Sequence, residues 1–364
     1  MRTFITPLLA VLALTLPLAG AEVTTFTTDA TIAADVTTYD GQGIIVSNCT
    51  LIVDGPHRFA SLILTDGAVL THSPAPGGET NNRLELTISG DVTVPAGCSV
   101  NVSGRGYGRD AGPGAGVGNG ANGGGGGGHG GCGGQGVGGA GGGSVYDLIS
   151  TPSQWGSGGG AGYASTPGAG GGCVHLTVGG VLHVDGSLVA DGGNSSRPGL
   201  GSYAGGGSGG SLWLEVGLLI GTGTISAKGG EGVNGGGGGG GRIAIYHGTN
   251  SFTGNLAAQG GSGFQRGGAG TIFTQANSDA HGQVLVDNGG NAGAPAILKS
   301  SLWSTSEVFH LTASGATVVH LEDAMPLENL RIRDGAILTH APQQESLSLR
   351  SEERRVGKEC RSRW

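Results

Sequence analysis

Acidic side chains able to perform hydrolytic chemistry are present in this 364-residue chain, but their spacing does not build a familiar active site. A polysaccharide lyase or glycoside hydrolase needs acids and bases that converge on one groove. The acids around the glycine-rich stretches fall on turns and strand faces without a recurring pair: Asp185, Asp191, Glu215 and Glu231. Residues 206–211, GGSGGS, lack the surroundings of a nucleophile elbow. These patterns predict a non-catalytic protein, and a carbohydrate-active β-helix enzyme is the alternative.

Signatures of cofactor and metal sites are also missing from the sequence. No G-x-x-x-x-G-K-[ST] phosphate loop occurs, and GRGYGR at 104–109 is followed by no helical pattern and no acid suited to a ribose. The ten histidines are scattered singly, without an H-E-x-x-H pair. His129 and Cys132 are two soft ligands in GHGGC, whereas a structural zinc site needs four. The sequence therefore predicts neither a cofactor nor a metal.

Three aromatic residues are candidates for ligand binding. Tyr107, Trp155 and Tyr163 lie in or beside glycine-rich stretches. Exposed rings at such positions would stack on sugar rings and make the chain an adhesin. Alternatively, the rings fill gaps between packed glycine segments, with their polar atoms bonded to nearby groups.

Two cysteines are candidates for a disulfide. The chain has five cysteines, one of them within 350–364. Cys132 and Cys173 lie within and at the end of the longest glycine stretch, so a bridge between them would stabilise the fold by roughly 3–5 kcal/mol. Secreted proteins allow such bridges. The alternative is four reduced thiols in the core.

A short β-unit that occurs five times must position these residues. Each copy alternates apolar and polar residues, breaks at glycine, alternates again and runs into more glycines. The copies begin near Arg83, Cys173, Ser211, Arg242 and Thr271. Alternation gives each unit one apolar face, which a single unit cannot bury but stacked units can. The chain is therefore predicted to be all-β, a parallel β-helix or solenoid of stacked short strands.

The glycine stretches follow the units at a fixed phase. They cover about 104–172, 192–210, 229–241 and 260–270. Loops at one phase of a solenoid emerge from one face, so we expect these excursions to cluster. Two forms are open: flexible linkers, or packed polyglycine-II helices with three residues per turn. The unbroken runs at 123–128 and 235–241 favour the ordered form.

A longer repeat indicates a second module. Residues 62–74 read LILTDGAVLTHSP and residues 330–342 read LRIRDGAILTHAP, with eight of thirteen positions identical. The Asp-Gly pair in each is typical of a turn. The chain is thus expected to complete one module and begin another, as a fragment of a longer protein.

Both ends carry sequence outside this pattern. Arg2, the apolar run to Leu18 and the segment Ala19–Ala21 predict a secretory signal cut after Ala21, hence an extracellular or cell-surface location. Residues 350–364, RSEERRVGKECRSRW, resemble a translated sequencing adapter and are expected to be an artefact, with a genuine basic tail as the alternative. The predicted organisation is a signal (1–21), an N-terminal β region (22–103), a glycine excursion (104–172), β-unit repeats (173–294), a truncated second module (295–349) and the tail (350–364).

Charge and composition exclude several classes of protein. Without Arg2 and the six basic and three acidic residues of 350–364, 11 basic and 23 acidic residues remain, a net charge of −12. Such a surface repels nucleic acid and anionic lipid. Past the signal there is no apolar run long enough for a transmembrane helix. The 82 glycines follow no G-X-Y period, which excludes collagen.

Four strings carry a resemblance to known proteins: GGGSGGSLWLEV, GTGTISAKGGEG, GGGGGGGRIAIYH and GGAGTIF. Between the signal and the tail, the chain resembles large glycine-rich surface proteins of environmental bacteria, of the autotransporter-passenger or adhesin type. Its glycine runs are also similar to glycine-rich modules of phage tail-tip adhesins and of certain receptor ectodomains. The resemblance implies a β-solenoid at the cell surface, and no site residue.

Together these observations predict an elongated, secreted or cell-surface β-protein with a structural or adhesive role. Its partners would be surface glycans or other cell-surface proteins, bound through the clustered glycine face. A purely mechanical spacer, with no binding patch, is a further class that the sequence leaves open.

Overall fold

The computed structural model describes residues 21–78, 82–120, 122–196, 203–303 and 308–340. These residues form twenty-three β-strands, one 3-10 turn (η1, Ser300–Leu302) and no α-helix. Within them, no helix is long and apolar enough to cross a membrane. The predicted signal and the predicted artefactual tail lie outside the described residues, apart from Ala21.

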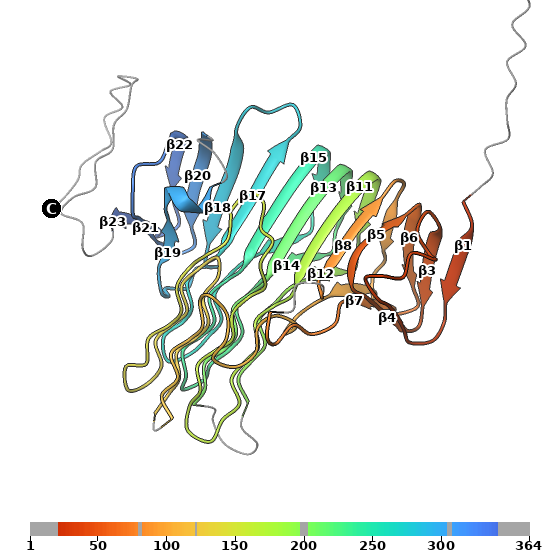
Figure 1. Cartoon of the computed structure of the whole chain (residues 1–364). Helices are drawn as coiled ribbons and strands as arrows, with labels where there is room; N and C mark the ends of the chain where they lie inside the picture. The colour runs from red at the N-terminus through yellow and green to blue at the C-terminus, as the bar shows by residue number, and fades with distance from the viewer. Residues whose placement is uncertain (1–20, 79–81, 121, 197–202, 304–307, 341–364) are drawn as a thin grey trace, which may run out of the picture.

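The largest sheet has thirteen strands and spans the whole molecule, from β1 at one end to β22 at the other (Figure 1). Its strands are β1 (Val23–Phe26), β3 (Gly43–Ser47), β5 (Gly55–Phe59), β6 (Ser61–Thr65), β8 (Leu84–Ile88), β9 (Val92–Val94), β11 (Cys173–Val184), β13 (Ser211–Gly221), β15 (Arg242–Phe252), β17 (Thr271–Ala276), β18 (Gly282–Asp287), β20 (Phe309–Ser314) and β22 (Leu327–Ile332). We call it the long sheet.

Two smaller sheets take up the alternate strands of the chain. A seven-stranded sheet holds β2 (Ala30–Ile32), β4 (Thr50–Val53), β7 (Val69–Thr71), β10 (Ser99–Asn101), β12 (Ser187–Val189), β14 (Thr224–Ser226) and β16 (Asn255–Ala257). A three-stranded sheet holds β19 (Ala296–Leu298), β21 (Val318–Leu321) and β23 (Ile337–His340). All strand pairs in both smaller sheets are parallel. The reason is that the chain passes through the long sheet and returns to the same side of the smaller sheet before it adds each new strand.

The core follows from the alternation in the repeated units. Leu176, Leu214 and Ile245 occupy one register line across β11, β13 and β15, and all three are fully buried. Each such side chain contributes about 1.5–3 kcal/mol by leaving water. The prediction of an all-β chain with long parallel sheets of short strands is confirmed.

The fifth unit departs from the pattern. β17 and β18 pair antiparallel, joined by a short polar turn at 277–281 where the preceding units continue the same strand past a glycine, Gly217 in β13 and Gly248 in β15. Strand direction reverses there, and the core changes face: Ile272 joins the cluster on one side of the long sheet, whereas Phe273 joins a second cluster with Trp303 and Phe309. The hairpin therefore separates two stacked parts with cores on opposite faces.

The long sequence repeat folds in the same way twice. Residues 62–74 supply the end of β6 and β7, and the described part of 330–342 supplies the end of β22 and β23. Asp66 and Asp334 both have positive φ, 54° and 53°, before their turn glycines. Ser47 Oγ donates to Asp66 Oδ2 at 2.8 Å, and Ser314 Oγ donates to Asp334 Oδ2 at 2.8 Å.

Candidate functional site

The glycine excursions lie side by side and hang from one side of the sheets (Figure 1). We call them the glycine layer, which comprises the described residues of 104–143, 155–172, 190–210, 227–241 and 258–270. Nearly all of the layer lacks assigned secondary structure, yet much of it is buried. Its order must therefore come from contacts between neighbouring segments.

Backbone hydrogen bonds in the layer repeat every three residues. Along 123–128, every third N–H points at the same neighbour: Gly124 and Gly127 donate to Tyr203 and Gly206, Gly125 and Gly128 to Val117 and Gly114, and Gly123 and Gly126 to Val137 and Gly134. The same period holds along 236–241, where the N–H groups of successive residues donate in turn to three segments: 124–127, 265–268 and 227–230. Each segment is therefore held from three sides, unlike a β-strand, which is held from two.

The spacing of these segments excludes side chains. A Cβ added to Gly125 would lie 1.9 Å from the carbonyl oxygen of Gly141, and one added to Gly236 would lie 1.8 Å from that of Gly134. Both contacts are with backbone, which cannot rotate away. Glycine is required at these positions by the close approach of main chains.

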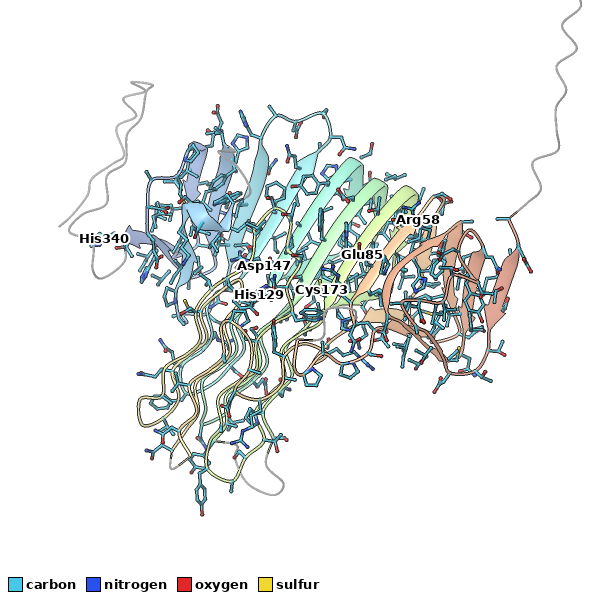
Figure 2. All side chains as sticks on the ribbon, in the orientation of Figure 1. Arg58, Glu85, His129, Asp147, Cys173 and His340 are labelled. Carbon is cyan, nitrogen blue, oxygen red and sulfur yellow. The ribbon has the colours of Figure 1, made fainter. Side chains whose placement is uncertain are left out.

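A buried polar cluster joins the glycine layer to the sheets. His129 and Asp147, both labelled in Figure 2, lie where the layer meets the long sheet. His129 Nδ1 donates to Gly209 O at 2.8 Å, and Nε2 donates to Asp147 Oδ2 at 3.3 Å. Both ring nitrogens of His129 therefore face oxygen atoms, one from the glycine layer and one from Asp147.

Asp147 is the centre of this cluster. Its Oδ2 also accepts the backbone N–H groups of Ser153 and Gln154, at 2.9 and 3.0 Å, and the Ser211 hydroxyl at 3.2 Å. Burial acts to raise the pKa of Asp147, but the hydrogen bond and charge of His129, the Gln154 N–H and the charge of Arg242 outweigh it and lower the pKa below 3.8. Asp147 is therefore a buried carboxylate held in its charged form.

Arg242 is the fully buried cation of the same cluster. Its Nε donates to the carbonyl oxygen of Tyr146 at 2.9 Å and its Nη1 to Thr271 Oγ1 at 3.0 Å. Burial lowers its pKa to about 10, although the charge of Asp147 acts in the opposite direction. Within the described residues Nη2 has no hydrogen-bond partner.

A second buried histidine lies on the sheet side of the junction. His72 Nδ1 donates to Ser73 O at 2.7 Å, so its Nε2 is free to accept the N–H of Cys173 at 3.1 Å. Burial lowers the pKa of His72 to about 4, mainly by desolvation. This neutral ring links Cys173, the first residue of β11, to the segment that directly follows β7.

The three predicted stacking residues do not form one surface. Trp155 is only 5% exposed and packs with Ala75 and Cys173. Tyr107 is half-buried and stands edge-on to Trp155, with ring centroids 6.0 Å apart. Tyr163 alone presents its ring, being 54% exposed beside Tyr203. The structure therefore does not bring the three rings together on one exposed surface, and the first two fill space between the layer and the sheet.

The predicted disulfide is not formed. Cys132 and Cys173 are both free thiols, as are Cys49 and Cys98. Cys132 packs against the cluster around Trp303, and Cys173 belongs to a different one. Burial raises the pKa of each of these two thiols to about 12. The long excursion is held by backbone hydrogen bonds and the buried cluster, so closing it needs no bridge.

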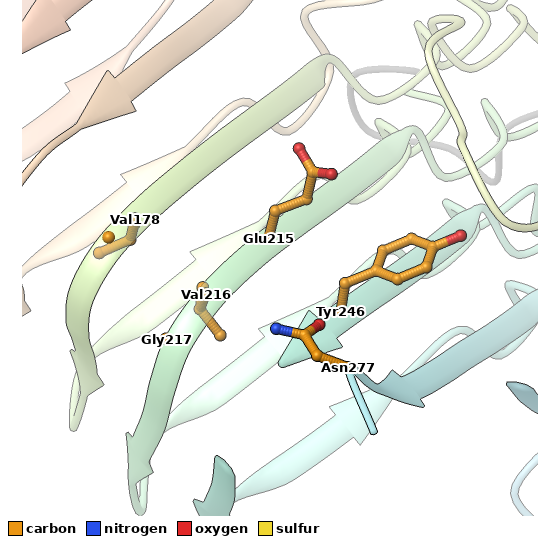
Figure 3. Close-up of a pocket in the computed structure, with 7 residues that line it drawn as sticks. Val178, Glu215, Val216, Gly217, Tyr246 and Asn277 are labelled. Atoms are coloured by element: carbon orange, nitrogen blue, oxygen red, sulfur yellow. The ribbon is translucent and has the colours of Figure 1, made fainter. Parts of the chain in front are cut away.

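An open groove lies over β11, β13 and β15 of the long sheet (Figure 3). Its volume is about 390 Å³, and it is lined by Val178, Gly179, Glu215, Val216, Gly217, Tyr246 and Asn277. Glu215 is the only carboxylate in this lining and accepts hydrogen bonds from His175 Nε2 at 3.1 Å and Thr177 Oγ1 at 3.2 Å. His175 stacks face to face on Trp213 at 3.9 Å. The groove offers a fixed carboxylate and a phenol ring beside a glycine floor.

The structural roles of Asp147, His175 and Arg242 were not predicted from the sequence. For Arg242, however, the repeat contained a signal. The register places Cys173, Ser211, Arg242 and Thr271 on one line at the starts of four strands. An arginine at a position where the other copies have a small residue must be buried with partners.

The comparisons with known proteins give no further guide. No family model, no curated protein and no solved structure matches this chain. Among the described residues, no group of three or more His, Cys, Asp or Glu side chains is arranged to hold a metal ion.

Proposed function

We propose that this chain is a secreted or cell-surface adhesive scaffold without catalytic activity, in which a parallel β-helix carries a polyglycine-II layer. The observation that supports this proposal is the three-residue period of the backbone hydrogen bonds in the layer. Three residues per turn is the repeat of the polyproline-II helix family. A slab of such helices is a rigid platform whose faces are main chain and whose turns are free to carry other residues.

The turns at the far edge of the glycine layer display apolar side chains. Four of the eight exposed large hydrophobic residues in the described structure lie there: Val117, Tyr163, Val233 and Phe264. Backbone contacts bring these turns together in pairs, since Tyr163 N–H donates to Asn122 O and Phe264 N–H donates to Gly235 O. Exposed apolar groups gathered at one edge are typical of a binding surface. We call this set the distal edge and propose that it contacts surface glycans or cell-surface proteins.

A binding experiment tests the adhesive role. The purified chain is applied to a glycan array and to intact cells, alongside a Tyr163→Ser/Phe264→Ser variant. Ile63→Ser, at an exposed position on β6, is the matched control. We expect the double variant to lose at least tenfold in binding while Ile63→Ser retains it. Equal binding by all three proteins, or no binding by folded wild-type protein, would refute the adhesive role and leave a mechanical spacer.

The groove supports a second candidate function, a carbohydrate-active enzyme. Glu215 is held by two donors and faces an open groove with Tyr246, which suits a polyhydroxylated ligand. Paired-acid hydrolysis requires a second carboxyl within roughly 10 Å on the other side of the bond, and the groove lining supplies one carboxylate. Depolymerisation of a polysaccharide panel that disappears in Glu215→Gln would favour the enzyme over the scaffold.

A further inference from the structure

Glycines form part of the floor of the groove over β11, β13 and β15. Gly179 and Gly217 line the groove, and Gly248 lies at the same place in β15; all three are exposed. A Cβ added to Gly217 would lie 2.7 Å from Gly179 O, and one added to Gly248 would lie 2.6 Å from Gly217 O. The main chains of neighbouring strands therefore approach too closely for side chains here, and the sheet stays open above them.

The side chains beside this floor are fixed by a second row of rings. Glu215 and Tyr246 are neighbours on one register line of β13 and β15. In the adjacent line, His175 stacks on Trp213 with ring centroids 3.9 Å apart, and His175 Nε2 lies 3.1 Å from Glu215 Oε2. The ring of Tyr246 rests against Phe273, with centroids 5.4 Å apart. The carboxylate and the phenol ring are thus held side by side, on strands about 4.8 Å apart.

One carboxylate oxygen of Glu215 is available to a ligand. Both donors, His175 Nε2 and Thr177 Oγ1, bond the same oxygen, Oε2. Within the described residues no hydrogen bond reaches Oε1, and the Glu215 side chain is 41% exposed. A carboxylate oxygen accepts its strongest hydrogen bonds from charged donors. This geometry therefore favours a cationic group of the ligand.

The charges around the groove point the same way. No lysine or arginine occurs among its lining residues, and Asp279 lies in the polar turn that follows β17. Along the register line of Glu215, Arg58 lies on β5, three strands away, which is roughly 14 Å. Arg242 of β15 is fully buried in the cluster with Asp147. A ligand anion would therefore be repelled, and an ammonium group attracted.

The size and lining of the groove favour a sugar chain as the carrier of this ammonium group. The volume of about 390 Å³ is near the lower end of ligand pockets, about 300–1,000 Å³, so the groove receives a short stretch of chain. Figure 3 shows Glu215, Tyr246 and Asn277 around it. The face of the Tyr246 ring can pack on a sugar ring and attracts a cation, and the Asn277 amide can bond a hydroxyl.

We propose that the groove binds a polysaccharide of amine-bearing sugars, a glucosamine polymer, with one ammonium group on Glu215 Oε1 and a sugar ring on Tyr246. Binding of this kind needs no second carboxylate. The site lies on the long sheet, apart from the distal edge, and does not depend on the adhesive contacts proposed there.

Calorimetric titration of the purified full chain tests this site. The probe is a hexamer of glucosamine. A hexamer of N-acetylglucosamine, which lacks the charge, is the matched ligand, and penta-lysine represents a cationic protein segment. Glu215→Gln removes the charge of the site, and Tyr246→Leu removes the ring. Glu231→Gln, at an exposed acid of the glycine layer, is the matched control for the loss of one charge.

We expect wild-type protein and Glu231→Gln to bind the glucosamine hexamer equally, and at least tenfold more tightly than the N-acetylated hexamer or penta-lysine. Glu215→Gln should weaken this binding at least tenfold, and Tyr246→Leu about fivefold. No binding by wild-type protein, equal binding of the two hexamers, equal or tighter binding of penta-lysine, or full binding by Glu215→Gln would overturn the proposal.

The distal-edge variant separates this site from the adhesive role. Tyr163→Ser/Phe264→Ser should bind the glucosamine hexamer as wild-type protein does, whatever it loses on the glycan array and on cells. Loss of hexamer binding in this folded double variant would place the ligand at the distal edge and overturn the groove as its site.

Discussion

Replacing Gly236 by alanine tests whether the glycine layer is held by close contact between main chains. The N–H of Gly236 donates to Gly124 O at 2.9 Å, and its carbonyl accepts the N–H of Gly206 at 3.0 Å. The added methyl carbon would lie 1.8 Å from Gly134 O. At least one neighbouring segment must therefore move away.

The expected cost has two parts. Forcing one methyl group into a packed region costs about 1–3 kcal/mol, and weakening two backbone hydrogen bonds adds about 0.5–1.5 kcal/mol each. Alanine also restricts the unfolded chain, which returns about 0.4–1 kcal/mol. Gly236→Ala should therefore lower the free energy of unfolding by about 1–5.5 kcal/mol.

Gly141→Ala is the matched control within the same layer. Its added methyl carbon would meet only a side-chain carbon of Val117, at an ordinary distance of 3.7 Å. We expect this variant to change stability by less than about 1 kcal/mol, in either direction. Denaturant unfolding followed by the fluorescence of Trp155, which is buried at the base of the layer, measures both variants. If Gly236→Ala and Gly141→Ala unfold at the same denaturant concentration, the close packing of the layer is refuted.

The buried cluster and the thiols give two further predictions. Asp147→Asn leaves Arg242 buried without its counter-charge and should lower the free energy of unfolding by about 3–5 kcal/mol. The pKa of Asp147 in the folded protein lies below its ordinary value of 3.8, so the stability that its charge contributes is complete above pH 3.8 and is lost as the pH falls through the lowered pKa. Acid should therefore destabilise wild-type protein more than Asp147→Asn. Equal acid sensitivity would contradict this assignment. Cys132 and Cys173, with pKa values near 12, should resist a thiol reagent at pH 8 in native protein and react in denaturant, whereas absence of reactive thiols in denaturant would restore the disulfide.

The stacked strands could be predicted from sequence because the apolar residues recur at the same position of each unit, and that recurrence specifies how the strands align. Val174, Leu212 and Ile243 recur at the same phase of their units and lie on one register line in the structure. The Asp-Gly pairs of the long repeat likewise specify the same turn twice. In these segments, the type of each side chain indicates the structure that its backbone adopts: apolar residues mark buried strand positions, and Asp-Gly pairs mark turns.

The partners within the glycine layer could not be predicted in the same way. Gly124 and Gly125 are identical in sequence, yet their N–H groups point to different segments, near Tyr203 and near Val117. A run of glycines has no side chains to distinguish one neighbour from another. The reversal at the β17–β18 hairpin was also missed, because Thr271 opens a unit that reads like the others.

The glycine layer is expected to depend on the sheets for its order. Fixing one residue's backbone costs about 1–2 kcal/mol, and glycine lies at the upper end. A net hydrogen bond returns about 0.5–1.5 kcal/mol, and glycine buries no apolar side chain in compensation. The free energy of ordering the glycine layer alone is therefore close to zero or unfavourable. The sheets make ordering favourable because they fix both ends of every segment.

A peptide of residues 104–172 tests this dependence. Cut from the chain, it loses Gly206, Gly209 and Gly240 as hydrogen-bond partners, along with Arg242 of the buried cluster. We expect its amides to exchange with solvent at unprotected rates, while the same amides in the whole chain are protected. Protection in the isolated peptide would show that the excursion becomes ordered without the sheets, and would contradict its dependence on them. Exchange at unprotected rates in the whole chain would instead refute the ordered layer, and with it the rigid platform on which the adhesive proposal rests.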